Sequence, residues 1–311
     1  MTRKLRDAKR IGAGQLLAGD CLTRLGDLRR QRPRFDLIYV DPPFNAGGSR
    51  GARREKGARN DGAFAYRDAW GGLDGFLKML APRLEAMAGL LSAQGSLWVH
   101  LDYRAVHDTK IALDSLLGRR AFRGEIIWVP GNGGRSRTGP SVTHQTILVY
   151  APGQLIWNAD DAALREPYAD TSLSMHFNQT DADGRRYRER TIGKKTYRYY
   201  ADVGRRLGSV WSDCPAMRAN TPLNPETTGY PTQKPERLLE RILRASTLPE
   251  SQVLDPMCGS GTTLAVAERL GRPWVGIDQS KTALETATKR LQACVQKQTS
   301  PGAKSLRGSD A

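Results

Sequence analysis

The 311-residue chain has few cysteines and few histidines, four of each, and both are scattered. The cysteines Cys21, Cys214, Cys258 and Cys294 lack the close spacing of a zinc site, and the histidines form no H-x-x-x-H pattern. We therefore expect reduced thiols that pack in the interior, and no metal. No stretch approaches the ~20 apolar residues of a membrane-spanning helix, and no apolar run follows the basic start. These absences predict a cytoplasmic protein.

Acidic residues are also in deficit, since 32 Asp and Glu stand against 48 Lys and Arg, for a formal net charge of +16. A surplus of this size favours polyanionic partners such as nucleic acid, although it says little about the fold. An Arg-rich proteome is the plainer alternative. Hydrophobic residues make up 39% of the chain, enough for the core of one large domain or of a domain with an insertion.

Short apolar runs alternate with segments that have apolar residues at helical spacing. Several runs are continuously apolar, as in strands that are buried on both faces. Strands are expected at residues 14–18, 35–40, 96–101, 124–129, 145–151, 252–255 and 274–278, and helices at 73–91, 103–117, 235–245, 262–270 and 281–294. This alternation predicts an α/β protein with a seven-stranded, mostly parallel sheet and helices on both faces.

A Gly-, Arg- and Ala-rich segment, residues 46–70, interrupts the alternation. It holds a dense set of cations, among them Arg50, Arg53 and Arg54. We expect a mobile, solvated loop in the free protein that orders on a phosphate backbone as a lid.

The second interruption, residues 152–230, is long, polar and aromatic. Between residues 185 and 200 its cations are interleaved with four tyrosines, a mixture that suits phosphate binding and base stacking. A charged hairpin face without a partner is the plainer alternative. The cations expected to bind DNA here are Arg185, Arg186, Arg188, Lys194 and Lys195.

A Gly-rich turn, Asp255-Pro256-Met257-Cys258-Gly259-Ser260-Gly261-Thr262, joins an expected strand to an expected helix. Its glycines let the backbone approach a ligand closely, and the helix N-terminus favours an anionic group. The next strand ends about twenty residues later in Asp278, a spacing that suits a carboxylate bound to ribose hydroxyls. An adenosine cofactor is the favoured interpretation, because the turn lacks the G-x-G-x-x-G spacing of dinucleotide sites. A structural turn is the alternative.

The strand at 35–40 is followed by an acid, a stiff turn and an aromatic ring, in Asp41-Pro42-Pro43-Phe44. An exocyclic amino nitrogen of adenine or cytosine is a poor nucleophile, because its lone pair is delocalised into the ring. Asp41 and the Pro42 carbonyl would each accept one of its N–H bonds while Phe44 stacks on the base, with no covalent intermediate. A base in a duplex must be flipped out to reach such a pocket. Carbon methylation would need a Cys nucleophile, usually in a Pro-Cys pair, and only the reverse Cys214-Pro215 occurs here.

The order of these motifs resembles the β class of the amino DNA methyltransferases, which methylate adenine N6 or cytosine N4. The Asp-Pro-Pro-Phe motif comes first, then the basic middle, then Tyr230-Pro231-Thr232-Gln233-Lys234-Pro235, and then the Gly-rich turn. The resemblance covers roughly residues 14–292. It implies a Rossmann-like methyltransferase sheet with a circularly permuted motif order and an inserted target-recognition region.

The same resemblance implies roles for single residues around the cofactor S-adenosyl-L-methionine. Asp20 and Cys21 would lie near its adenine, the segment with Thr232 and Lys234 would grip its methionine carboxylate, and Asp278 would hold its ribose. The turn residues Asp255, Pro256, Met257, Gly259, Gly261 and Thr262 would wrap its methionine part. Val99-His100-Leu101-Asp102 resembles a strand end that borders the base pocket. Met257 stands where the family usually has Phe, so we expect a modified cofactor wall.

The favoured function is methylation of adenine N6, because an Asp at the head of the tetrapeptide is commoner in the family's adenine enzymes. Cytosine N4 is the alternative. A methyltransferase of RNA or of protein glutamine is less favoured, because those families resemble chains with Asn-Pro-Pro-Tyr. A non-catalytic DNA-binding module is less favoured because the motifs are intact. The partners implied are double-stranded DNA, a second copy in a homodimer, and a cognate restriction nuclease. The expected organisation is a catalytic half at 1–151, target recognition at 152–230, a cofactor half at 231–295 and a disordered tail at 296–311.

Overall fold

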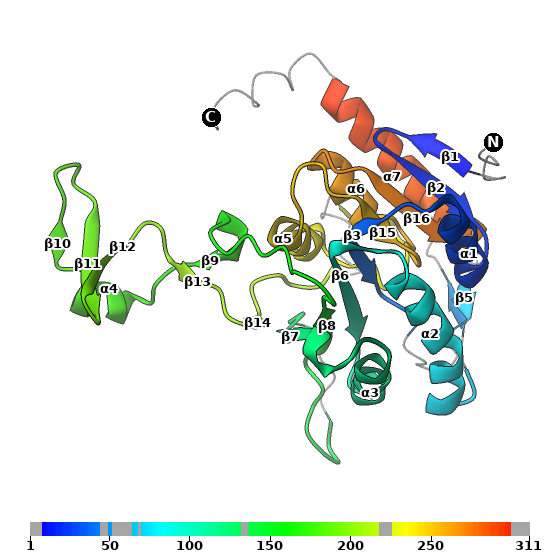
Figure 1. The fold of residues 1–311 in the computed structure, drawn as a ribbon, viewed down its shortest axis with the longest axis horizontal. Coiled ribbons are helices and arrows are strands. Elements are labelled where there is room, and N and C mark those ends of the chain that lie inside the picture. Colours follow the sequence, from blue (N-terminus) through cyan, green and yellow to red (C-terminus); the bar gives the residue numbers. More distant parts are fainter. Residues whose placement is uncertain are drawn as a thin grey trace.

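The structure is a computed structural model that describes residues 8–43, 49–51, 64–67, 70–131, 136–217 and 226–299. A central sheet with helices on both faces forms the body of the molecule, and an extension built from the middle of the chain projects from it (Figure 1). None of the helices within these ranges is both long and apolar enough to cross a membrane.

The central sheet has nine strands in the described part of the chain, in the order β1-β2-β16-β15-β3-β6-β8-β7-β14. These strands are β1 Ala8–Ile11, β2 Gly14–Ala18, β3 Phe35–Val40, β6 Leu91–Leu101, β7 Phe122–Trp128, β8 Gln145–Tyr150, β14 Val210–Trp211, β15 Val253–Asp255 and β16 Trp274–Asp278. Strands β2, β16, β15, β3 and β6 are mutually parallel, while β8 runs antiparallel between β6 and β7. All seven expected strands lie in this sheet, and the unexpected β1 and β14 extend it at its edges.

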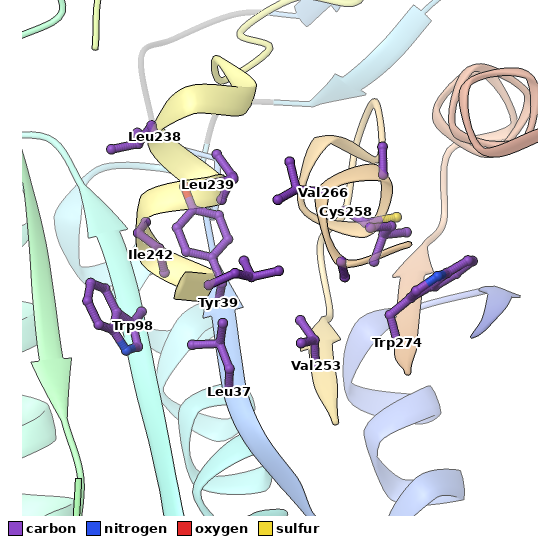
Figure 2. Close-up of a cluster of buried hydrophobic side chains, with 14 of the residues drawn as sticks. Leu37, Tyr39, Trp98, Leu238, Leu239, Ile242, Val253, Cys258, Val266 and Trp274 are labelled. Carbon is purple, nitrogen blue, oxygen red and sulfur yellow. The ribbon is translucent and has the colours of Figure 1, made fainter. Parts of the chain in front are cut away.

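The two faces of the sheet are covered by different groups of helices. Helices α1 Cys21–Gln31, α2 Leu73–Ala88 and α3 Val106–Leu117 lie on one face, and α5 Glu236–Ser246, α6 Thr262–Arg269 and α7 Lys281–Thr299 lie on the other. Alternate residues of β3 point to opposite faces, so Leu37 and Tyr39 pack toward α5, and Ile38 and Val40 toward α2. Figure 2 shows Tyr39 beside Leu239 of α5, with Leu37 further along the strand. Burial on both faces explains why the central strands are continuously apolar.

Several element boundaries differ from the prediction. Helix α1 was not expected, because it is rich in arginine and buries only Cys21, Leu25 and Leu28. Helix α2 ends at Ala88 and β6 begins at Leu91, so the helix expected to reach residue 91 gives way to a longer strand. Helix α7 continues to Thr299, so the expectation of a disordered tail from residue 296 is wrong for residues 296–299. The rest of that tail lies outside the described residues.

The extension comes from residues 152–217 and carries small elements of its own. They are β9 Arg165–Glu166, α4 Asp170–His176, β10 Gln179–Thr180, β11 Arg186–Ile192, β12 Lys195–Tyr200 and β13 Arg205–Arg206. Strands β10, β11 and β12 form an antiparallel sheet, and β14 then returns the chain to the central sheet by pairing with β7. The extension therefore leaves and rejoins the body beside β7 and β8 (Figure 1).

The basic segment at 46–70 lies mostly outside the described residues, Arg53 and Arg54 included. Its described backbone forms a hairpin in which β4 Ser49–Gly51 pairs with β5 Phe64–Arg67, and Arg50 lies opposite Tyr66. The expectation of a mobile lid therefore remains a prediction.

Candidate active site

A cavity of about 450 Å³ lies at the carboxyl ends of the parallel strands. In open α/β sheets this is the edge at which ligands bind, because loops from neighbouring strands converge there. Thirteen of the fifteen residues predicted to be catalytic or to bind the cofactor line it, namely Asp20, Cys21, Asp41, Pro42, Pro43, Thr232, Lys234, Asp255, Pro256, Met257, Gly259, Thr262 and Asp278. Motifs more than two hundred residues apart in the sequence thus share one pocket. Of the other two, Gly261 is not part of the lining, and Phe44 lies outside the described residues.

Asp41 and Lys234 form an ion pair inside this pocket. Asp41 directly follows β3, and its Oδ2 accepts a hydrogen bond from Lys234 Nζ, whose side chain is only 8% exposed. The other oxygen, Oδ1, is buried and has no hydrogen-bond partner among the described residues. Burial raises the pKa of Asp41, and the charge and hydrogen bond of Lys234 oppose this rise. A buried polar oxygen rarely lacks a partner, so Oδ1 is suited to an N–H donor supplied by a ligand.

Behind Asp41, Tyr39 and His100 join β3 to β6. The Tyr39 hydroxyl and His100 Nδ1 are 2.8 Å apart, and the His100 ring lies edge-on to Trp128 with 5.3 Å between centroids. Burial, with a contribution from the Lys234 charge, holds the pKa of His100 well below its usual range, so the imidazole is neutral. Sequence reasoning placed His100 at the border of the base pocket but missed its contact with Tyr39. The sequence feature that could have predicted this contact is that both residues lie near the ends of neighbouring parallel strands.

Just after β6, Asp102 binds Arg104 at the wall of the pocket. The Arg104 backbone N–H donates to Asp102 Oδ1 over 3.0 Å, and its Nε donates to Oδ2 over 2.8 Å. Both residues line the cavity, so a guanidinium group stands at its wall.

The Gly-rich turn is tied to the end of the next strand. Gly259 N donates to Asp278 Oδ2 over 2.9 Å, and Ser280 N donates to Asp278 Oδ1 over 2.8 Å. Gly259 has φ +50, and a Cβ there would lie 3.2 Å from the Tyr230 ring. A side chain at this position would strain the backbone and crowd Tyr230, so glycine keeps the turn close to the pocket.

Gly261 has a packing role instead. Its φ is +74, and a Cβ there would lie 2.8 Å from the Cβ of Ala287 on α7. It lets α7 approach the start of α6, where the Thr262 hydroxyl accepts a hydrogen bond from Arg290 Nη1 over 2.9 Å.

Asp255, the carboxyl group of the turn, has a strongly perturbed pKa. Burial raises its pKa to about 7, hydrogen bonds from Thr263 and the Met257 N–H oppose the rise, and the charges of Asp41 and Asp278 add to it. Met257 packs at the edge of the core on the α1–α3 side and lines the cavity, and its place in the cofactor wall remains a prediction.

Asp20 caps α1 and is held by an arginine that the sequence did not single out. It accepts from Thr23 N over 3.0 Å and from Arg83 Nη2 over 2.7 Å. Burial tends to raise the pKa of Asp20, but the Thr23 N–H and Arg83 outweigh it and the pKa is lowered. Neighbouring Cys21 is buried, which raises its pKa to about 12, so its thiol packs without acting as a nucleophile.

The segment before α5 is held in an unusual conformation. Thr232 has φ 59, in the left-handed region that a β-branched residue seldom adopts. Gln233 anchors it, because Gln233 Oε1 accepts from Thr228 N over 3.0 Å and its Nε2 donates to the Glu226 carbonyl over 2.7 Å. Strain of this kind persists only where the surroundings enforce it, and Lys234, two residues further on, lines the pocket.

Three of the arginines predicted to bind DNA are already engaged within the extension. Arg185 forms a bidentate ion pair with Asp202 at 2.9 and 3.0 Å. Arg186 donates to the carbonyls of Phe177 and Leu173, and the Arg188 guanidinium lies 5.2 Å from the Phe177 ring centre. Arg186 and Arg188 thus connect β11 to the end of α4, and Arg185 connects the start of β11 to the segment after β12, so their positions indicate a structural contribution.

The tip of the β11–β12 hairpin presents cations differently. Arg190, Lys194 and Lys195 are exposed, and within the described residues none of them forms a hydrogen bond or an ion pair through its side chain. Gly193 supports the turn with φ 62. A patch of positive charge therefore stands at the end of the extension, away from the body (Figure 1).

Comparison with known proteins agrees with this geometry. The model of the N6/N4 methyltransferase family, described as DNA methylase, matches residues 35–289. The Type II methyltransferase M.EcaI of Enterobacter cloacae is 27% identical over 314 residues, covering 86% of this chain and 67% of that protein. The crystal structure of the M1.HpyAVI–SAM complex superposes with a TM-score of 0.54 at 20% identity, covering 89% of this chain and 98% of that one. The cytosine-N4-specific PvuII DNA methyltransferase gives 0.54 at 15% identity, covering 93% and 94%.

The two structural matches concern the fold, which is the predicted Rossmann-like methyltransferase sheet. The family match spans most of the chain and includes the Asp-Pro-Pro motif, the extension, Lys234 and the Gly-rich turn. On this match, the chain belongs to the N6/N4 DNA methylase family.

Proposed function

We propose that this protein transfers a methyl group from S-adenosyl-L-methionine to the exocyclic N6 of an adenine that it flips out of duplex DNA. The observation that carries the proposal is the buried Asp41 Oδ1, which has no hydrogen-bond partner among the described residues. Family membership supports DNA amino methylation in general. The choice of adenine rests on Asp at the head of the Asp-Pro-Pro-Phe motif.

The residues at the cofactor end of the cavity fit S-adenosyl-L-methionine. Each carboxylate oxygen of Asp278 accepts one backbone N–H, which leaves lone pairs for the two ribose hydroxyls. Asp255 and the backbone of Gly259 face the same space from the turn. Asp20, fixed by Arg83, would mark the adenine end. When bound, the cofactor supplies an electrophilic methyl group.

The catalytic contribution of the chain is to position the base and to polarise its amino group. Asp41 Oδ1 would accept one amino N–H and the Pro42 carbonyl the other, which draws the nitrogen lone pair out of conjugation with the ring. Positioned groups of this kind act without a covalent intermediate. The role of Phe44 in stacking remains a prediction. In the described part of the chain Cys21 and Cys258 line the cavity, and burial raises the pKa of both, which supports amino rather than carbon methylation.

Incubation with isotopically labelled cofactor and double-stranded DNA tests the proposal directly. We expect label in DNA and, after digestion to nucleosides, N6-methyladenine. N4-methylcytosine would establish the alternative base, and label in carbon-5 of cytosine or in no nucleoside at all would contradict the proposed chemistry. RNA and protein substrates incubated in parallel provide the controls.

We further propose that the hairpin tip, defined by Arg190, Lys194 and Lys195, contacts the DNA backbone. This proposal is supported by the exposure of these three side chains and by their lack of ion pairs within the described residues. Changing all three residues to alanine should weaken DNA binding and lower the slope of log affinity against log salt by about 2 to 3, because about 0.9 counterions are released for each phosphate neutralised. Fluorescence anisotropy at several salt concentrations measures both quantities.

Arg198, which pairs with Glu189 and lies over Tyr187, offers a matched control on the same hairpin. Arg198→Ala should destabilise the extension in thermal melts with a smaller change of salt slope. An unchanged slope in the triple variant would show that the tip does not contact phosphates, and the basic segment at 46–70 would then be the next candidate.

A further inference from the structure

We infer that Lys234 is a positioning residue for Asp41, which keeps that carboxylate ionised and oriented toward the target amino group. The inference rests on the proposed function and deepens it, since the resemblance assigned Lys234 only to the methionine carboxylate of the cofactor. The geometry behind it is the direct ion pair between Lys234 Nζ and Asp41 Oδ2. This contact occupies one oxygen of the carboxylate, and the other, Oδ1, is buried and has no hydrogen-bond partner among the described residues.

The ammonium group is held firmly in place. Lys234 is followed by Pro235, whose fixed φ of −69 precedes the first turn of α5. On its other side, Gln233 is bound to Thr228 and to the Glu226 carbonyl. Glu226 is itself fixed, because its Oε2 accepts from Glu236 N over 3.0 Å. A flexible side chain thus enters the pocket from a rigid backbone.

The surroundings of Asp41 make a compensating cation necessary. Asp255, on the neighbouring strand β15, is a second carboxyl group that interacts unfavourably with ionised Asp41. Tyr39, two residues before Asp41, carries no positive charge. His100 from β6 is neutral and contributes none either. Among these neighbours Lys234 supplies the positive charge, against the burial that raises the pKa of Asp41. An opposite charge at this range typically lowers a carboxyl pKa by about 1 to 3 units.

Ionisation matters because a protonated carboxyl group is a weaker acceptor for the amino N–H. A lysine ammonium has three N–H donors, so donation to Asp41 does not prevent a second contact with a cofactor carboxylate. The two roles differ in their pH dependence. Loss of a cofactor contact alone is overcome by saturating cofactor, whereas loss of the charge beside Asp41 moves the acid limb of the methylation rate.

The experiment measures single-turnover methylation at saturating cofactor from pH 5.5 to 9 in Lys234→Met and Lys234→Arg. In Lys234→Met the pKa of Asp41 should rise further. The fall of the methylation rate toward acid pH, the acid limb, should then begin at a pH that is higher by about one unit or more. Lys234→Arg keeps the charge and should restore the limb toward its original position. Asp278→Asn should weaken cofactor binding and leaves Asp41 and Lys234 in place, so the pH of the acid limb should stay unchanged.

A second readout does not depend on methylation. In protein with ¹³C-labelled aspartate carboxyl groups, the resonance of Asp41 is identified by its absence in Asp41→Asn, and its titration is compared with and without Lys234. A higher midpoint in Lys234→Met, and also in Lys234→Gln if the Met variant does not fold, supports the inference. An unchanged midpoint overturns it. Failure of the native protein to methylate DNA would instead overturn the proposed function, while this titration would still report on the ion pair.

Discussion

Replacing Asp41 with alanine is expected to lower the methylation rate by about 100-fold or more while cofactor affinity stays nearly unchanged. The magnitude is that of removing one preorganised electrostatic group from an active site. Asp41 lines the cavity at the end of β3, and its buried Oδ1 has no partner among the described residues, whereas the residues suited to the cofactor come from the ends of β2, β15 and β16 and from the turn after β15. Calorimetry with S-adenosyl-L-methionine and a single-turnover assay on DNA separate the two effects.

Asp36, at the opposite end of the same strand, gives the matched control. It accepts hydrogen bonds from Ser92 Oγ over 2.6 Å and from Gln252 N over 2.9 Å, away from the cavity. Asp36→Ala should lower the melting temperature and preserve the rate per folded molecule. If Asp41→Ala kept a substantial part of native turnover, the assignment of the target amino group to Asp41 would be wrong.

Replacing Asp278 with alanine is expected to weaken cofactor binding by about 1.5 to 3 kcal/mol, the range for a hydrogen bond to a charged group, or roughly 10- to 150-fold in Kd. The change removes the acceptor proposed for the ribose. It also frees Gly259 N and Ser280 N, which the Asp278 carboxylate holds in the described structure. The turn would lose its anchor as well as the ligand, so the effect should lie toward the upper end of the range.

Calorimetry measures the affinity, and a circular dichroism melt checks that the fold survives. Glu285→Ala is a suitable control, because Glu285 is an exposed acid on α7 whose side chain is 61% accessible. Its removal should leave cofactor affinity unaltered. Native affinity in Asp278→Ala would mean that the ribose lies elsewhere and that Asp278 only supports the turn.

The residues at the ends of the parallel strands could be predicted well from the sequence. Asp41, Asp255 and Asp278 each follow a continuously apolar run, and parallel strands bring such positions to one edge of a sheet. The glycines in the strand-to-helix turn after β15 indicated which part of the pocket would bind the cofactor. The seven inner strands of the central sheet and helices α2, α3, α5, α6 and α7 followed from the same alternation, whereas the order of the strands, the two edge strands and α1, whose apolar pattern is weak, did not.

Contacts between side chains from distant segments could not be predicted in the same way. The Arg83–Asp20 pair depends on how α2 lies beside α1, and the Lys234–Asp41 pair depends on the strained path through Thr232. Composition likewise favoured Arg185, Arg186 and Arg188 as DNA contacts together with Lys194 and Lys195. It could not distinguish Arg186, which donates to carbonyls of the extension, from Lys194, which is exposed at its tip.

The place of β15 and β16 in the sheet affects how the chain is built on the ribosome. Strands β2 and β3 are separated by only 16 residues, yet neither pairs with the other, because β16 and β15 lie between them. Until residues 253–278 emerge, the facing edges of β2 and β3 have no partner strand. Unpaired edges of this kind invite intermolecular pairing, and such distant contacts form slowly. A nascent chain that stops before Val253 lacks the centre of its sheet as well as its cofactor turn.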